Sequence, residues 1–154
     1  MDAEISEGIF AAYLDKYEMV YTRHYRVSRG KNVDFKIKTP SVVLCDVKEV
    51  QDSRSDSGSK IDAYSHIRDD ICKLRKKFKN VKPQEPVILV TMNFSSNFFT
   101  AFTVAQAMLG DVGFTFTNGK RGEARHLPRG NAAVTKNGNT AISGILVFDA
   151  ECGN

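Results

Sequence analysis

The hydrophobic residues of this chain follow two different periods along the sequence. Apolar residues recur every three or four positions in three segments, and this spacing predicts helices from residue 2 or 3 to 17, at 61–78 and at about 97–109. Alternating or continuous apolar runs predict strands at 19–27, 33–38, 42–50, 87–92, 112–117 and 141–148. The order of these elements indicates an α/β fold, in which helices flank both faces of a central mixed sheet whose first strands are antiparallel.

Turn and loop residues connect the predicted elements. Residues 28–32 supply turn chemistry between the first two strands and so predict a hairpin. The third strand, 42–50, begins apolar on both faces, which is typical of a central strand covered on both sides. A serine-rich loop at 52–59 follows that strand, and an Asn-Gly pair at 118–119 signals a later turn. The glycine-rich, basic segment 120–139 fits no element.

Composition places the chain in the soluble globular class. A chain of 154 residues, with 42% hydrophobic and 26% charged residues, has the size and composition of one such domain. No apolar window reaches the roughly 20 residues that cross a bilayer, so we expect no membrane association. The first residues lack the features of a signal peptide, and three cysteines without CxxC spacing favour reduced thiols. We therefore expect a cytoplasmic protein.

Charge is distributed unevenly along the chain. The net charge of +4 conceals three basic segments, 20–38, 60–82 and 120–136, whose net charges are +5, +5 and +4. Acidic segments separate them. If the fold gathers the basic segments on one face, they form the electrostatic surface that binds a phosphate backbone. Solvated lysine-rich faces are common, and they are the alternative interpretation.

One group of polar residues points to a specific chemistry. Side chains alternate across a strand, so Asp46 and Lys48 share one face of the strand 42–50, close to its apolar start. Burying charged groups there requires either a pairing or a function. Asp34, the only acid of the segment 20–38, lies on a neighbouring strand. Two carboxylates from adjacent strands suit Mg²⁺ or Mn²⁺, and a nearby lysine can orient water and offset charge on phosphorus.

These residues resemble the motif of the PD-(D/E)xK nuclease superfamily, whose core has the element order α-β-β-β-α-β. The motif here is Val33-Asp34, eleven residues, then Asp46-Val47-Lys48, with a helix before it and a basic helix after it. The resemblance covers roughly residues 1–95 and implies a restriction-endonuclease-like three-layer α/β/α core, with 1–154 as a single domain. Val33 stands where the motif name has proline, a residue without chemistry, and Asp46 is the less frequent of the two acids.

The resemblance also implies roles for individual residues. Asp34 and Asp46 would be metal ligands and Lys48 the catalytic lysine. The acid of the first helix is best matched by Glu7, which flanks the apolar stripe of that helix and would complete the metal site. Lys60, just before the second helix, and His66, on it, are the nearest equivalents of residues that contact phosphate in the family.

The function implied by this resemblance is Mg²⁺-dependent hydrolysis of phosphodiester bonds, with Mn²⁺ as a substitute metal. Resemblance alone favours DNA over RNA as the substrate, and it also suggests a homodimer. One alternative is a nucleic-acid-binding module of the same fold that does not cut, and another is a regulatory domain that contacts acidic proteins. For Asp46 and Lys48 the ordinary alternative is a salt bridge on a solvated strand face. Asp34 could likewise pair with Lys36 or Lys38, and Glu7 could be a surface acid.

Other chemistries find little support in the sequence. The histidines His24, His66 and His126 are scattered and have no HExxH or CxxC companions, which argues against a zinc enzyme. No GxSxG motif, Walker A loop or GxGxxG motif is present, so neither an acyl-transfer nucleophile nor a nucleotide cofactor is indicated.

Overall fold

The structure of the chain is a computed structural model that describes residues 3–28, 30–38, 40–51, 63–78, 83–94, 100–110, 112–117, 119–126 and 142–149. These residues form the helices α1 (Ala3–Lys16), α2 (Ala63–Phe78) and α3 (Ala101–Leu109). They also form the strands β1 (Tyr21–Ser28), β2 (Lys31–Ile37), β3 (Val43–Val50), β4 (Val87–Asn93), β5 (Val112–Thr117), β6 (Lys120–His126) and β7 (Gly144–Asp149). Every helix and strand expected from the sequence is therefore present, with ends that differ by a few residues.

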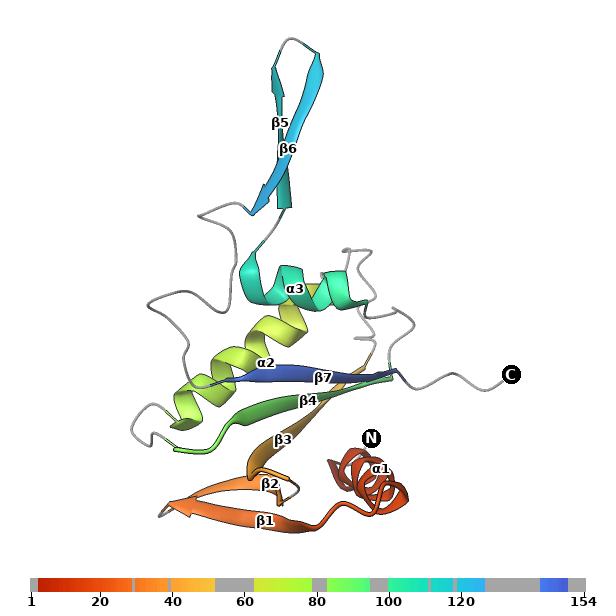
Figure 1. The fold of residues 1–154 in the computed structure, drawn as a ribbon, viewed down its shortest axis with the longest axis vertical. Helices are drawn as coiled ribbons and strands as arrows, with labels where there is room; N and C mark the ends of the chain where they lie inside the picture. Colours follow the sequence, from red (N-terminus) through yellow and green to blue (C-terminus); the bar gives the residue numbers. More distant parts are fainter. Residues whose placement is uncertain are drawn as a thin grey trace, which may run out of the picture.

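Five strands form the main sheet, in the order β1-β2-β3-β4-β7 (Figure 1). The first two pairings, β1 with β2 and β2 with β3, are antiparallel, whereas β4 pairs parallel with both β3 and β7. The sheet is therefore mixed, its first strands form the predicted hairpin, and the fold class is α/β. Strand β3 lies in the middle of the sheet, which confirms its predicted central position.

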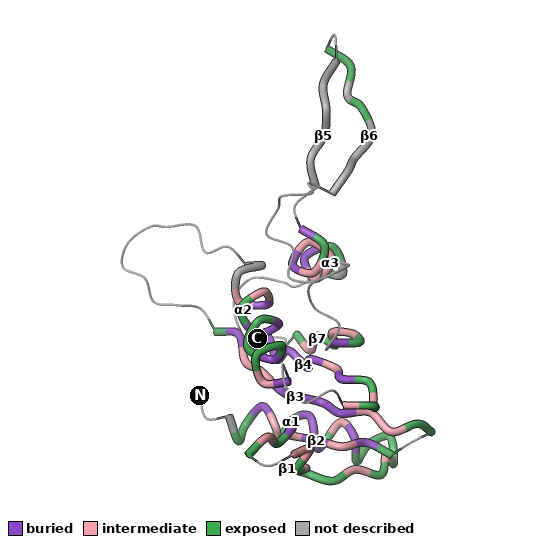
Figure 2. Tube along the Cα trace, turned by 90° about the vertical axis from the view of Figure 1, so that its left-hand side faces the viewer, coloured by how far each residue is buried: buried purple, intermediate pink, exposed green. Residues whose placement is uncertain are grey.

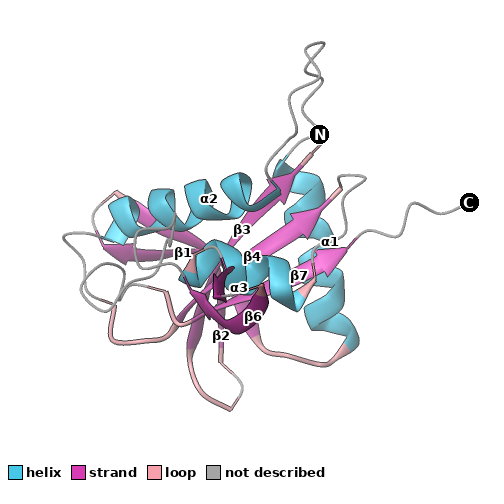
Figure 3. Cartoon of the chain, turned by 90° about the horizontal axis from the view of Figure 1, so that it is seen from above, coloured by secondary structure: helices cyan, strands magenta, loops and turns pink. Residues whose placement is uncertain are grey.

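Helices cover both faces of this sheet. The ribbon shows α1 on one side of the sheet and α2 with α3 on the other (Figures 1 and 3). Buried residues concentrate where the strands β3 and β4 run between the helices (Figure 2). The core accordingly has two clusters, one on each face of the sheet.

The alternation of β3 determines which of its residues meet which helix. Cys45 and Val47 belong to the cluster that contains Phe10 and Leu14 of α1. Leu44 and Val50 belong to the cluster that contains the apolar stripe of α2: Ile67, Ile71, Leu74 and Phe78. Residues 46 and 48, which lie between Leu44 and Val50 in the same alternation, therefore face α2.

The structure differs most from the sequence-based prediction in the segment after α3, where two strands pair outside the main sheet. Strands β5 and β6 form a separate antiparallel hairpin that projects away from the sheet beyond α3 (Figure 1). Its turn passes through Gly119 at φ 74°, a conformation that favours glycine, as the Asn-Gly signal predicted. Strand β6 begins the segment 120–139 that fitted no element, and the rest of that segment, from 127, lies outside the described residues.

Helix α3 begins at Ala101, later than the predicted start at about 97. Thr100 is its N-cap: the Thr100 hydroxyl accepts a hydrogen bond from the Thr103 backbone N at 3.2 Å, and the Thr103 hydroxyl accepts one from the Thr100 backbone N. This reciprocal capping box fixes the first turn. Residues 95–99, which include the predicted start, lie outside the described residues. None of the helices described is long and apolar enough to cross a membrane.

Candidate active site

The candidate site begins where β2 and β3 separate. Their backbone pairing runs from Ile37–Val43 to Phe35–Cys45. Next to this last pair, Oδ2 of Asp34 accepts a hydrogen bond from the backbone N of Val47 at 2.6 Å. A side-chain carboxylate thus takes the β3 donor that a continued ladder would pair with the β2 backbone. This bond ties Asp34 to the residue between Asp46 and Lys48.

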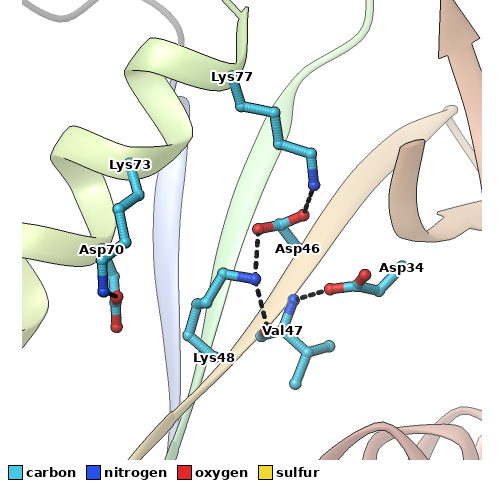
Figure 4. A network of polar contacts seen from close by, with 7 residues as sticks. All are labelled: Asp34, Asp46, Val47, Lys48, Asp70, Lys73 and Lys77. Carbon is cyan, nitrogen blue, oxygen red and sulfur yellow. Dashed lines mark hydrogen bonds and ion pairs between the residues drawn. The ribbon is translucent and has the colours of Figure 1, made fainter. Parts of the chain in front are cut away.

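Asp46 occupies the centre of the site. Only 1% of its side chain is exposed, and both carboxylate oxygens lie next to lysine ammonium groups (Figure 4). Nζ of Lys48 lies 2.8 Å from Oδ2 and donates a hydrogen bond to the Val47 carbonyl at 2.9 Å. Nζ of Lys77, from the last turn of α2, donates a hydrogen bond to Oδ1. The structure therefore brings together Asp34, Asp46 and Lys48, as expected, and adds Lys77.

Both carboxylate oxygens of Asp46 face an ammonium group. Nζ of Lys48 lies 2.8 Å from Oδ2, and Nζ of Lys77 donates a hydrogen bond to Oδ1. Each oxygen of this buried acid thus has a positively charged partner among the described residues.

The electrostatics of the two carboxylates reflect their proximity. The pKa of Asp34 is raised, first by burial and then by the negative charge of Asp46. The hydrogen bond from Val47 and the positive charges of Lys48 and Lys77 oppose this increase in the pKa without cancelling it. Repulsion between two carboxylates is relieved when a cation binds between them, so the pair is a suitable place for a divalent ion.

Lys48 is a cation in this site. Burial alone would lower its pKa, but the negative charge of Asp46, together with Asp34 and Asp70, raises the pKa above its ordinary value. The Lys48 side chain therefore keeps its proton at neutral pH. It can donate hydrogen bonds and offset negative charge, but it is not available as a base.

The site also includes part of a polar stripe on α2. His66, Asp70, Lys73 and Lys77 are spaced so that they share one side of the helix. Lys73 pairs with Asp70 at 3.0 Å, and 68% of its side chain is exposed beside the site (Figure 4). His66, a predicted phosphate contact, is half-buried near the start of this stripe. Lys60, the other predicted contact, lies outside the described residues.

Glu7 does not join the other predicted residues. Its Oε2 lies 3.0 Å from Nη2 of Arg23 and 3.7 Å from Nε2 of His24, on the side of α1 that meets β1. Helix α1 reaches β3 instead through Ser6, whose hydroxyl donates a hydrogen bond to the Glu49 carboxylate. In the described part of the chain, no three His, Cys, Asp or Glu residues gather as a metal site. Of the predicted acids, Asp34 and Asp46 are therefore brought to Lys48 and Glu7 is not.

The contacts of Asp46 and Asp34 differ from those of ordinary surface pairs. The ion pair between Asp46 and Lys48 exists, but Asp46 is buried against α2 and does not lie on a solvated strand face. The charged groups that act on Asp34 are Asp46, Lys48 and Lys77, and neither Lys36 nor Lys38 is among them. Nζ of Lys36 instead lies 3.7 Å from Glu85. Both observations favour a site over incidental surface pairing.

Lys77 was not among the site residues predicted from the sequence. The helix 63–78 has several basic residues, and the residues next to its apolar stripe are the ones that can reach the sheet. Lys77 precedes Phe78 at the edge of that stripe, which was the available signal. Lysines lie next to the apolar stripe on both of its edges, however. The sequence therefore does not show which lysine reaches Asp46, because this depends on how α2 lies over β3.

The residues present fit a divalent cation of the magnesium type. Mg²⁺ is commonly held by one or two carboxylates, with water and substrate phosphate completing its coordination. Asp34 and Asp46 supply two carboxylates from adjacent strands, and after burial the negative charge of Asp46 is the main cause of the raised pKa of Asp34. Asp34 and Asp46 would therefore hold the ion.

Comparison with known proteins adds no family to this geometry. No family model matches the sequence, and no curated protein or solved structure is significantly similar to the chain.

Proposed function

We propose that this protein is a metal-dependent nuclease of the PD-(D/E)xK type that hydrolyses phosphodiester bonds in DNA. The observation that carries the proposal is the meeting of Asp34, Asp46 and Lys48 at the point where β2 leaves β3. These three residues come from the two strands that the motif requires, and Lys48 points toward Asp46 instead of away from it.

The arrangement of the surrounding elements supports the same proposal. The order α1-β1-β2-β3-α2-β4 agrees with the α-β-β-β-α-β order of that superfamily. The acids lie on an antiparallel pair, β2 with β3, and the basic helix α2 covers the face on which they meet. The restriction-endonuclease-like version of the α/β fold is part of this proposal.

Each residue of the site has a role in the proposed reaction. A bound Mg²⁺ would supply Lewis-acid stabilisation of the phosphate and would lower the pKa of an attacking water. Asp34 and Asp46 would hold that ion. Lys48, a cation next to them, would orient water and offset the negative charge that develops on the phosphate oxygens. The Asp34 bond to the Val47 backbone fixes the strand between these two groups.

The basic side of α2 gives the site access to a nucleic-acid backbone. Lys73 is largely exposed and Lys77 is partly exposed, one helical turn apart on the same stripe. Lys77 contacts Asp46, and Lys73 pairs with Asp70, whose negative charge acts on Lys48 (Figure 4). Ammonium groups placed in this way attract phosphate regardless of base sequence.

A second candidate function is a nucleic-acid-binding module of the same fold that does not cut. One observation favours it: Lys48 and Lys77 already neutralise Asp46, so its charge is compensated without a metal ion. The two candidates predict the same binding of nucleic acid but opposite results in a cleavage assay.

The experiment that separates them measures cleavage of plasmid, linear, branched and single-stranded DNA, and of RNA, with Mg²⁺, Mn²⁺ or EDTA. The proteins are the wild type, Lys48→Ala and the control Lys16→Ala, which removes an exposed lysine from α1 on the opposite face. Metal-dependent cleavage that Lys48→Ala abolishes and Lys16→Ala retains would support the nuclease. Equal cleavage by all three proteins would refute the assigned site, and salt-sensitive binding without cleavage would identify the binding module.

A further inference from the structure

Lys77 lies outside the motif but pairs directly with one of the motif's two acids, Asp46. It reaches Asp46 from α2, whereas Lys48 comes from the same strand as the acid. Its Nζ donates a hydrogen bond to Oδ1 of Asp46, and 27% of its side chain remains exposed. An ammonium group thus occupies one of the two oxygens that a cation bound by Asp46 would use.

The charges of the site balance while Lys77 is in place. Asp34 and Asp46 carry two negative charges, and Lys48 and Lys77 carry two positive charges close to them. The neighbouring Asp70 also acts on Lys48, but it pairs with Lys73 at 3.0 Å, so this pair leaves the balance unchanged. A divalent cation added to this group would lie next to two ammonium groups, and like charges at such short range repel each other strongly. Withdrawal of one lysine from Asp46 would relieve this repulsion when a cation binds.

Lys77 is the lysine that can withdraw. Lys48 is held by a second bond, to the Val47 carbonyl at 2.9 Å, and it follows Asp46 by only two residues along the same strand. For Lys77 the described contact is the one with Asp46. The Lys77 side chain is long, flexible and partly exposed, so its ammonium group can move into solvent. Lys73, one turn earlier on the same helix, is largely exposed.

We propose that Lys77 is an exchangeable counter-ion of this site. In the metal-free protein it neutralises Asp46. When a divalent cation binds, Lys77 leaves Asp46 and becomes a contact for the phosphate backbone of the substrate. This inference rests on the proposed nuclease function, because it requires that Asp34 and Asp46 bind a metal ion. It assigns to α2 a residue that couples metal binding to substrate binding.

The first test measures Mn²⁺ binding by calorimetry in the absence of nucleic acid. It compares the wild type with Lys77→Gln and with the matched control Lys76→Gln, which removes an exposed lysine from the same helix. Removal of the competing ammonium should tighten Mn²⁺ binding by about tenfold in Lys77→Gln, since a charged hydrogen bond no longer has to be broken. The affinity of Lys76→Gln should equal that of the wild type. Unchanged or weaker binding by Lys77→Gln would overturn the proposal.

The second test measures DNA binding at several salt concentrations, in a Lys48→Ala background that prevents cleavage. With Mg²⁺ present, Lys77→Gln should reduce the slope of log affinity against log salt by about one, because one phosphate contact is lost. In EDTA the same substitution should leave the slope unchanged, since Lys77 is then bound to Asp46. An equal loss of slope in both conditions would show that Lys77 is an ordinary surface contact.

A measurement on the wild type tests the proposal even if the Lys77 variant does not fold. In an NMR titration with Mg²⁺, the side-chain signals of Lys77 should shift while those of Lys76 do not, and unmoved Lys77 signals would contradict the exchange. The outcomes also separate this inference from the proposed function. If the wild type binds metal and cuts DNA but Lys77→Gln binds Mn²⁺ equally well, only the role of Lys77 fails. If neither protein binds Mn²⁺, both proposals fail.

Discussion

The carboxylate of Asp34 accepts a hydrogen bond from the backbone N of Val47 at 2.6 Å, so an acid of β2 holds the residue that separates Asp46 from Lys48. The bond has a structural purpose, because it satisfies a β3 donor at the point where the backbone ladder with β2 ends. It also brings the second carboxylate to the side of the strand where Asp46 and Lys48 lie. Structure and proposed chemistry therefore depend on the same side chain, and variants can separate them.

Two substitutions of Asp34 should differ in stability. Asp34→Asn keeps an oxygen that can accept the hydrogen bond from Val47, whereas Asp34→Ala leaves that backbone donor unpaired. The free energy of unfolding should therefore fall by about 1–3 kcal/mol in Asp34→Ala and by less in Asp34→Asn. Urea denaturation in EDTA measures both values. Equal stability of the two variants would show that the bond to Val47 contributes little.

The raised pKa of Asp34 makes a prediction about pH. Burial and the charge of Asp46 raise the pKa of Asp34 in the folded protein above its ordinary value of 3.8, so the folded state binds the proton more tightly than the unfolded state. The contribution of this group to stability should therefore decrease as pH rises from 3.8 through the folded pKa, and then become constant. The difference in unfolding free energy between the wild type and Asp34→Asn, measured in EDTA across this range, isolates the effect. A difference that grows with rising pH would contradict the assigned shift.

Cys45 and Cys72 should react differently with alkylating reagents. Burial, assisted by the charges of Asp34 and Asp46, raises the pKa of Cys45 to about 12, and its side chain lies in the core beneath α1. Cys72 is exposed on α2. In native protein at pH 8, iodoacetamide should modify Cys72 and leave Cys45 intact, and Cys45 should react only after unfolding. Peptide mapping by mass spectrometry identifies the modified residue, and rapid native alkylation of Cys45 would contradict its burial.

Glu7 offers a test between the sequence-based role and the structural one. If Glu7 were a metal ligand, Glu7→Gln would abolish metal-dependent cleavage. In the structure its carboxylate instead pairs with Arg23 and lies close to His24, so Glu7→Gln should retain cleavage and lose about 1 kcal/mol of stability or less. Cleavage assays and thermal unfolding of the same preparation check both parts. Loss of cleavage in a stable Glu7→Gln variant would return Glu7 to the site.

The parts of the site that the sequence predicted are those that local geometry determines. Alternation along a strand places Asp46 and Lys48 on one face, and the turn residues between the first two strands predict the hairpin that brings Asp34 to the neighbouring strand. Whether Asp34 reaches Val47 could not be read from the pattern, because it depends on where the β2–β3 ladder ends.

The remaining features depend on packing between elements. Lys77 reaches Asp46 only because α2 lies over β3, and the period of the helix does not identify which of its lysines faces the acid. The position of Glu7 likewise depends on how α1 is rotated against β1. Strand β6 has a glycine and several charged residues and no apolar alternation, so its sequence does not predict a strand. It is a strand because its backbone pairs with β5.

The central claim is that Asp34 and Asp46 hold the metal ion that allows this protein to cut nucleic acid. The most direct test is the rate of Mg²⁺-dependent plasmid cleavage by the wild type and by Asp34→Asn, which preserves the hydrogen-bond acceptor for Val47 and removes the charge. The account predicts cleavage by the wild type in Mg²⁺ but not in EDTA, and a rate at least about 100-fold lower for folded Asp34→Asn. Equal rates for the two proteins, or no cleavage by the wild type of any DNA or RNA substrate, would contradict it.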